Sequence, residues 1–222
     1  CTPFDEYSVD KIIEMNFDII KVASCSADDW PLLEKIVSSG LPIIVSTGGL
    51  NLNEIDNLVS FFKHKGSYFS IMHCISIYPM ENKDAHIGFI KKLCARYPDI
   101  VIGWSTHERP SNADIIKLAY VSGARIYERH VGKSSERYKL NEYSSNPEQV
   151  ENWINNLQIA KDIYGNEKKN IKETELKSLN KLKRGIFLSV KKNKGEVIKS
   201  NEVYFAIPFE DKQMHSGMWQ EG

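Results

Sequence analysis

The 222-residue chain carries 29 Lys and Arg against 29 Asp and Glu, and 41% of its residues are hydrophobic. This composition is typical of a globular protein with a sizeable core, and the balanced charge excludes an overall field that would attract nucleic acid or an anionic membrane. No apolar run approaches the ~18 residues that a membrane span needs. The scattered cysteines, Cys1, Cys25, Cys74 and Cys94, have no metal-binding or disulfide spacing, which favours a reducing cytoplasm.

Strands and helices alternate along residues 1–165. Buried apolar runs predict the strands, and amphipathic patterns with capping, Pro or Gly signals predict the helices. The predicted strands are 18–24, 42–47, 68–76, 100–104 and 125–128, and the predicted helices start near Ser8, Pro31, Asn51 or Asn53, Ile87, Pro110 and Pro147. This spacing indicates parallel β/α units, in either an open doubly wound sheet or a (β/α)8 barrel.

The placement of polar residues discriminates between these two folds. Polar pairs stand at the carboxyl ends of five successive strands: Lys21 and Ser24, Ser46 and Thr47, Ser76 and Tyr78, Ser105 and His107, Glu128 and His130. Such ends converge on one mouth in a barrel, whereas in an open sheet they lie in a row. We therefore predict an α/β fold, a partial (β/α)8 TIM barrel over residues 1–165, because so few strands cannot close a full one.

The pattern changes after residue 165. Residues 166–183 are rich in lysine and predict a charged, partly helical linker. Short strands at 185–190 and 203–207, with a turn at 192–196, follow it. We expect residues 184–222 to be the start of a small β-rich second domain that stops before it could bury a core.

Two histidines close successive predicted strands. His107 and His130 are separated by a helix-like segment, and the ends of parallel strands open on the same side of a sheet. With Ser105, Glu108 and Glu128 nearby, the two imidazoles suit a divalent metal with open coordination positions. Either histidine alone could be an ordinary polar strand end, but their equivalent positions favour the metal.

Lys21 interrupts an apolar strand, which is costly unless its ammonium group reaches solvent or an anion. The hydroxyls of Thr2, Ser24, Ser46 and Ser105 and the amides of Gly48 and Gly49 are expected at the same mouth. These groups favour a phosphate or carboxylate site centred on Lys21 over simple exposure to solvent. A phosphate site beside a metal indicates metal-assisted carbon–carbon bond or phosphate-ester chemistry.

An ordered set of short motifs covers nearly the whole chain. The motifs are Thr2-Pro3-Phe4-Asp5, Lys21-Val22-Ala23-Ser24, Leu41 to Gly48, His73-Cys74 with Tyr78-Pro79, Ser105-Thr106-His107 and Glu128-Arg129-His130. The set resembles the sialic acid synthase (N-acetylneuraminate synthase) family. Residues 184–198 also resemble the opening of that family's carboxyl-terminal antifreeze-like (SAF) domain.

The resemblance implies a TIM-barrel enzyme that condenses phosphoenolpyruvate with N-acetylmannosamine or a related N-acetylated amino sugar, giving a nonulosonic 2-keto acid and phosphate. It implies that His107 and His130 hold a manganese-type ion, with magnesium or cobalt as alternatives, and that Lys21 joins them as a catalytic residue. The implied phosphoenolpyruvate pocket contains Thr2, Lys21, Ser24, Ser46, Ser76, Tyr78 and Ser105. A homodimer of the intact protein is also implied, with no nucleic acid or membrane partner.

Departures from the family pattern bear mainly on the identity of the acceptor sugar. Ser26 replaces a glutamate, residues 139–142 replace a Gly-Pro-Asp loop, Ile207 replaces an arginine before Pro208, and Ser76 stands where asparagine is common. The family's amino-terminal strands, which supply a glutamate and a lysine, have no counterpart, so we expect a chain truncated at both ends with little catalysis alone. Two alternatives remain: another metal-dependent aldolase on the same barrel, and a catalytically silent carbohydrate-binding or assembly module.

Overall fold

The computed structural model describes residues 1–210 and 212–220, so residues 211, 221 and 222 of the predicted second domain lie outside the described residues. The chain forms two compact units, Cys1–Gly165 and Asn166–Gly222. Among the described residues, no helix is both long and apolar enough to cross a membrane.

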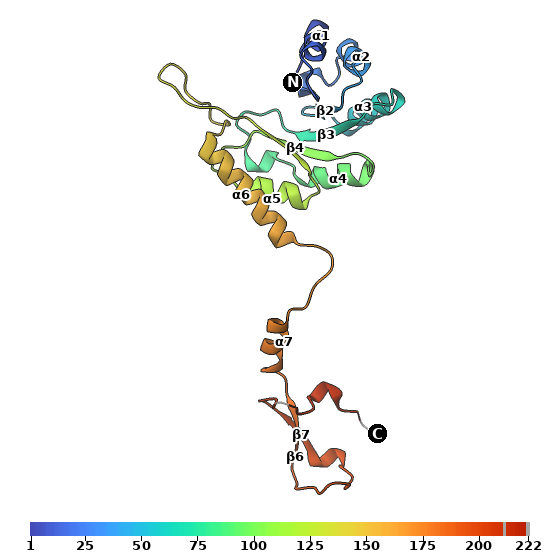
Figure 1. The fold of residues 1–222 in the computed structure, drawn as a ribbon, viewed down its shortest axis with the longest axis vertical. Coiled ribbons are helices and arrows are strands. Elements are labelled where there is room, and N and C mark those ends of the chain that lie inside the picture. The colour runs from blue at the N-terminus through green and yellow to red at the C-terminus, as the bar shows by residue number, and fades with distance from the viewer. Residues whose placement is uncertain (211, 221–222) are drawn as a thin grey trace. The chain divides into compact units, whose positions relative to one another are not determined.

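The first unit is built on a five-stranded parallel sheet with the strands in chain order. Its elements are α1 (Glu6–Glu14), β1 (Ile20–Val22), α2 (Trp30–Ser38), β2 (Ile43–Ser46), α3 (Leu52–His64), β3 (Phe69–Cys74), α4 (Gly88–Arg96), β4 (Ile102–Thr106), α5 (Asp114–Val121), β5 (Ile126–Arg129) and α6 (Pro147–Tyr164). Each right-handed crossover here leads to the next strand in the same direction, so all the connecting helices lie on one face of the sheet. This strand order matches a barrel, whereas a doubly wound sheet reverses the direction partway along the chain. Figure 1 shows the helices in chain order along an arc outside the strands.

The register of the strands matches that of a TIM barrel. At the level of the mouth the paired residues are Lys21 with Ile44, Ser46 with Met72, Cys74 with Ser105, and Ser105 with Glu128. From β1 to β5, the residue at the mouth lies two positions further along β2 than the partner of Lys21, and two positions further along β3 than the partner of Ser46. The register therefore shifts by four residues over four strand pairs. A closed (β/α)8 barrel has a shear of about 8, or one residue for each strand pair.

One ion pair shows that the sheet is curved. Lys21 Nζ on β1 lies 3.1 Å from Glu128 Oε2 on β5, although these are the two edge strands. In a flat sheet four strand spacings would separate them by about 19 Å, beyond the reach of the two side chains. The sheet is therefore strongly curled into part of a barrel, and the predicted fold class is confirmed.

The core lies between the outer face of the sheet and the helices. It includes Ile20, Val22, Val45, Ile71, Ile102 and Trp104 from the strands and Leu33, Ile36, Ile55, Leu58, Phe62, Ile90, Leu93 and Ile115 from the helices, all buried. Helix α3 shows how the sequence achieves this packing. Asn51 and Glu54 form a capping box at its start, and Ile55, Leu58 and Phe62 recur at helical spacing on the buried face.

Several predicted boundaries differ from the structure. Asp5 caps α1 by accepting a hydrogen bond from Ser8 N at 2.6 Å, so the predicted cap at Ser8 was wrong. Strand β4 runs two residues beyond the predicted end at Trp104. Helix α5 starts at Asp114 instead of Pro110, because Asn112 N bonds to Arg109 O in a turn that delays the helix.

The second unit contains α7 (Glu173–Asn180) and an antiparallel pair, β6 (Gly185–Leu188) and β7 (Val203–Ala206). Both strands are shorter than the predicted 185–190 and 203–207. Among the described residues of this unit only Gly185 is buried. Its assignment as the opening of a SAF domain stays a prediction.

His73 on β3 makes the stability of the first unit sensitive to pH. The ring is 5% exposed and packs against Phe89 and Trp104, with Nε2 3.0 Å from Ala85 O. Burial lowers the pKa of His73 below its ordinary value of 6.5. The unfolded state therefore takes up a proton first, and the free energy of unfolding should decrease as the pH falls below about 6.5, by at most ~1.4 kcal/mol per pH unit for this histidine.

Urea unfolding at pH 7.5 and pH 5.5 measures this effect. We expect the His73→Gln variant to lose part of the pH dependence of the parent. His64→Gln, at the exposed end of α3, is the matched control and should leave it unchanged. An equal decrease in the parent and in His73→Gln would contradict the assignment.

Candidate active site

The predicted site residues line one cavity of about 500 Å³ at the carboxyl ends of the strands. All nine are present: Thr2, Lys21, Ser24, Ser46, Ser76, Tyr78, Ser105, His107 and His130. Phe4, Ala23, Cys25, Cys74 and Glu128 complete the lining. A larger cavity, of about 750 Å³, lies beside α3 and α4; it shares Cys74 with the first cavity and contains none of the nine. The first cavity is therefore the candidate site.

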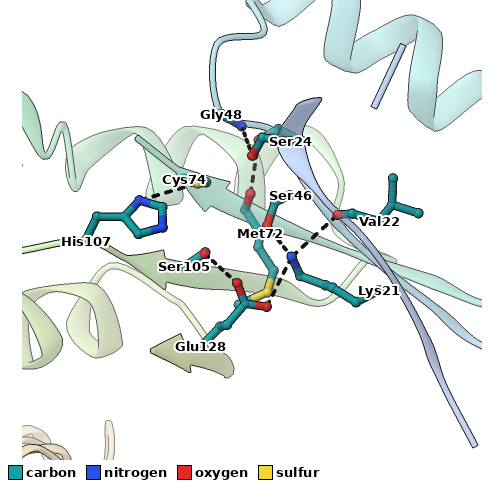
Figure 2. A network of polar contacts seen from close by, with 11 residues as sticks. Lys21, Val22, Ser24, Ser46, Gly48, Met72, Cys74, Ser105, His107 and Glu128 are labelled. Atoms are coloured by element: carbon teal, nitrogen blue, oxygen red, sulfur yellow. Dashed lines mark hydrogen bonds and ion pairs between the residues drawn. The ribbon is translucent and has the colours of Figure 1, made fainter. Parts of the chain in front are cut away.

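A network of charged and hydroxyl groups crosses the cavity (Figure 2). Lys21 Nζ lies 2.8 Å from Ser46 Oγ and 3.1 Å from Glu128 Oε2, and Ser105 Oγ donates to Glu128 Oε1 at 2.8 Å. Among the described lining residues Lys21 is the one lysine or arginine. An anionic ligand would therefore meet an ammonium group whose direction is already fixed by Ser46 and Glu128.

Sequence reasoning missed the ion pair between Lys21 and Glu128. Glu128 was recognised only as a neighbour of the histidines, because its contact with Lys21 depends on the curvature of the sheet. The alternation of side chains along β5 was the available signal. Glu128 and His130 are two residues apart and so lie on the same face.

Gly48 lies against the hydroxyl groups of the cavity. Its N–H donates to Ser24 Oγ at 3.0 Å, and a Cβ at this position would lie 2.8 Å from the same oxygen. A side chain here would displace the hydroxyl groups of both Ser76 and Ser24, so the packing favours glycine. The expectation that the Gly48 amide is free for an anion was wrong, and Gly49 lines the larger cavity instead.

The two histidines face each other across the cavity. Their ring centroids are 5.2 Å apart, and the Tyr78 ring lies 4.1 Å from that of His107. His107 Nδ1 lies 2.6 Å from Ile75 O. Since a carbonyl oxygen only accepts, Nδ1 carries the proton and the lone pair of Nε2 is available.

Both imidazoles are favoured in the neutral form. Burial is the main cause that lowers the pKa of His107, and burial followed by the charge of His107 lowers the pKa of His130. A metal ligand must be unprotonated, so these shifts favour coordination at neutral pH.

The two-histidine set fits a divalent ion that keeps open positions. The bond from His107 Nδ1–H to Ile75 O is the outer-shell contact that usually orients a ligating histidine. Among the described residues, no group of three or more His, Cys, Asp or Glu side chains could hold an ion together. Two imidazoles would fill only part of the coordination sphere of a divalent ion, with positions left for water and substrate.

The residues at which the sequence departs from the family pattern lie at different places in the structure. Ser26 is buried, and Glu142 pairs with Arg109 outside the lining of the cavity. Neither position supplies a carboxylate to the candidate site. Ile207 belongs to the second unit.

Comparisons with known proteins identify relatives of this chain in sequence and in fold. The N-acetylneuraminate-9-phosphate synthase of Drosophila melanogaster is 29% identical over 216 residues, which are 86% of this chain and 58% of that protein. The crystal structure of spore coat polysaccharide biosynthesis protein E from Chromobacterium violaceum has a TM-score of 0.88 at 42% identity, covering 100% of this chain and 66% of that one. The N-acetylneuraminic acid (sialic acid) synthetase of Leptospira borgpetersenii, solved in complex with citrate, has a TM-score of 0.72 at 33% identity over 80% of this chain and 62% of that one.

The chain spans about three fifths of the length of the curated relatives it matches. The sequence profile of the NeuB family matches residues 1–169, which include every residue of the candidate site. The predicted resemblance to sialic acid synthases is therefore confirmed, and the chain belongs to the NeuB family.

Proposed function

We propose that this protein condenses phosphoenolpyruvate with N-acetylmannosamine or a related N-acetylated amino sugar to give a nonulosonic acid and phosphate. The observation that carries the proposal is a single cavity that combines an ammonium group, several hydroxyls and two facing imidazoles. Membership of the NeuB family supports a synthase of this class. The relatives named above make two different products, so the family alone leaves the acceptor sugar open.

Phosphoenolpyruvate carries a phosphate and a carboxylate, and the Lys21 side of the cavity suits both. The Lys21 ammonium group donates charge-assisted hydrogen bonds to these anions. The hydroxyls of Thr2, Ser24, Ser46, Ser76 and Ser105 add neutral donors around them. Tyr78, packed on His107, closes the side of the cavity next to the imidazoles.

His107 and His130 would hold the metal, and manganese is the ion we propose. When bound, such an ion acts as a Lewis acid that polarises the aldehyde oxygen of the sugar. In the proposed reaction, the π electrons of the C2=C3 double bond of phosphoenolpyruvate form the new bond from carbon 3 to the aldehyde carbon, whose carbonyl electron pair moves to oxygen and takes a proton. Water adds to the resulting cation at carbon 2 and loses a proton. Cleavage of the bond between carbon 2 and the phosphate oxygen then releases phosphate, and loss of the hydroxyl proton leaves the 2-keto group.

Sugar-dependent release of phosphate tests the proposal. The full-length parent of this chain is incubated with Mn²⁺, phosphoenolpyruvate and, in turn, N-acetylmannosamine, its 6-phosphate and a diacetamido sugar. Release with at least one sugar, with equal consumption of phosphoenolpyruvate, supports the synthase. An absence of release with every sugar contradicts the proposal. In that case, sugar binding without turnover would indicate a silent carbohydrate-binding module. Consumption of pyruvate in place of phosphoenolpyruvate would indicate another aldolase.

We also propose that the intact protein is a homodimer and that its setting is cytoplasmic. The four cysteines are free thiols, as a reducing compartment maintains them. Light scattering at micromolar concentration measures the assembly, and a monomer would contradict the dimer.

A further inference from the structure

A buried ion pair joins the chain segments that carry the two histidines. Arg129 Nη1 donates to Glu108 Oε1 at 2.9 Å, and the two side chains are 3% and 1% exposed. Glu108 directly follows His107, and Arg129 directly precedes His130. The pair therefore connects the backbone next to one histidine with the backbone next to the other.

The ion pair lies behind the wall of the cavity. Arg129 is in register with Thr106, whereas Glu128, which lines the cavity, is in register with Ser105. Since successive side chains on a strand point to opposite faces, Arg129 is on the helix-covered face. Its guanidinium lies 5.8 Å from the ring of Trp153 on α6. Contact with a substrate in the cavity is therefore excluded for Arg129.

The guanidinium donates hydrogen bonds to two chain segments, the one that follows β4 and the one that precedes α6. Nη2 donates to Glu108 O at 3.2 Å, so the backbone after His107 is held directly. Nε donates to the hydroxyl of Ser145, whose own N–H donates to His130 O at 2.9 Å. The backbone on both sides is thus tied to one rigid group, and lysine has no equivalent fork.

Stability alone does not account for this pair. Burial raises the pKa of Glu108 and lowers that of Arg129, because removal of each charge from water disfavours its charged form. A buried ion pair is often no more stabilising than apolar side chains of the same volume. The specific gain is geometric: the pair fixes the ends of β4 and β5 relative to each other.

We propose that Glu108 and Arg129 are positioning residues for the histidine pair. They hold the His107 and His130 rings at the 5.2 Å centroid separation at which both imidazoles can bind one divalent cation. This role rests on the metal site of the proposed function.

Titration with Mn²⁺ by calorimetry tests the proposal. Arg129→Lys keeps the charge and removes the fork, and Glu108→Gln keeps the shape and removes the charge. We expect each to raise the Kd for Mn²⁺ about tenfold or more, as loss of a group that orients a metal ligand usually does. Both should also shift the visible absorption bands of bound Co²⁺. Arg125→Lys is the matched control: it adjoins the start of β5 and bonds only to the carbonyls of Tyr120 and Ala124, so both readouts should stay at parent values.

The result that overturns the positioning role is specific. If folded Arg129→Lys and Glu108→Gln bind Mn²⁺ with the parent Kd and the parent Co²⁺ spectrum, the pair only packs, whatever the change in Tm. His107→Ala measured alongside separates this failure from a failure of the metal site, because unchanged binding in His107→Ala would refute the site itself. Should Arg129→Lys not fold, the double variant Glu108→Leu/Arg129→Met removes both charges together and carries the same measurement.

Discussion

Replacing Lys21 by methionine is expected to raise the Kd for phosphoenolpyruvate by about 10²-fold or more. Lys21 is the one lysine or arginine among the described lining residues, and its Nζ lies 2.8 Å from Ser46 Oγ. The substitution removes the charged donor and also leaves Glu128 without its cation, so the carboxylate would repel the incoming anion. Isothermal titration with phosphoenolpyruvate, with and without Mn²⁺, measures the loss.

Two further variants separate these contributions. Lys21→Met combined with Glu128→Gln removes the repulsion and should recover part of the affinity. Lys11→Met, which removes an exposed lysine of α1 paired with Glu14, should bind like the parent. If Lys21→Met binds phosphoenolpyruvate with the parent Kd, the assignment of the anion site to Lys21 is wrong.

Replacing either histidine by alanine should abolish useful metal binding. With two protein ligands, the loss of one leaves a single imidazole, so the Kd for Mn²⁺ should rise by at least about 10²-fold and sugar-dependent phosphate release should fall by about 10³-fold. The measurements are Mn²⁺ titration of His107→Ala and His130→Ala and the phosphate assay at saturating phosphoenolpyruvate.

The exposed His64 supplies the control for these two variants. His64→Ala, at the end of α3, removes an exposed imidazole that does not line the cavity and should keep parent affinity. If His107→Ala and His130→Ala bind Mn²⁺ as tightly as His64→Ala does, the two histidines are ordinary polar residues of the barrel rim.

Local sequence patterns were sufficient to predict the barrel and most of the polar residues that line its cavity. Apolar runs and capping residues located the strands and helices, and polar residues at successive strand ends identified the mouth. These signals depend on neighbouring residues alone, so they survive without knowledge of the sheet. Exact boundaries depend on turns such as the one at Asn112, and these shifted by a few residues.

The contacts between distant segments could not be predicted in the same way. The pairing of Lys21 with Glu128 requires the curl of the sheet, and the pairing of Glu108 with Arg129 requires the register of β4 against β5. The use of the Gly48 amide by Ser24 likewise depends on how closely two loops approach. Each of these contacts is a consequence of tertiary geometry, which single-sequence patterns do not encode.

The register shift of two residues on β2 and two on β3 restricts how this cavity can evolve. A substitution at the mouth changes one side chain. Insertion or deletion of a residue inside β2 or β3 would instead turn the following side chains of that strand to the opposite face of the sheet, so that apolar core residues would face the cavity. New acceptor specificities in this lineage should therefore arise by exchanging side chains and by altering loop length, while the number of residues in each strand remains fixed.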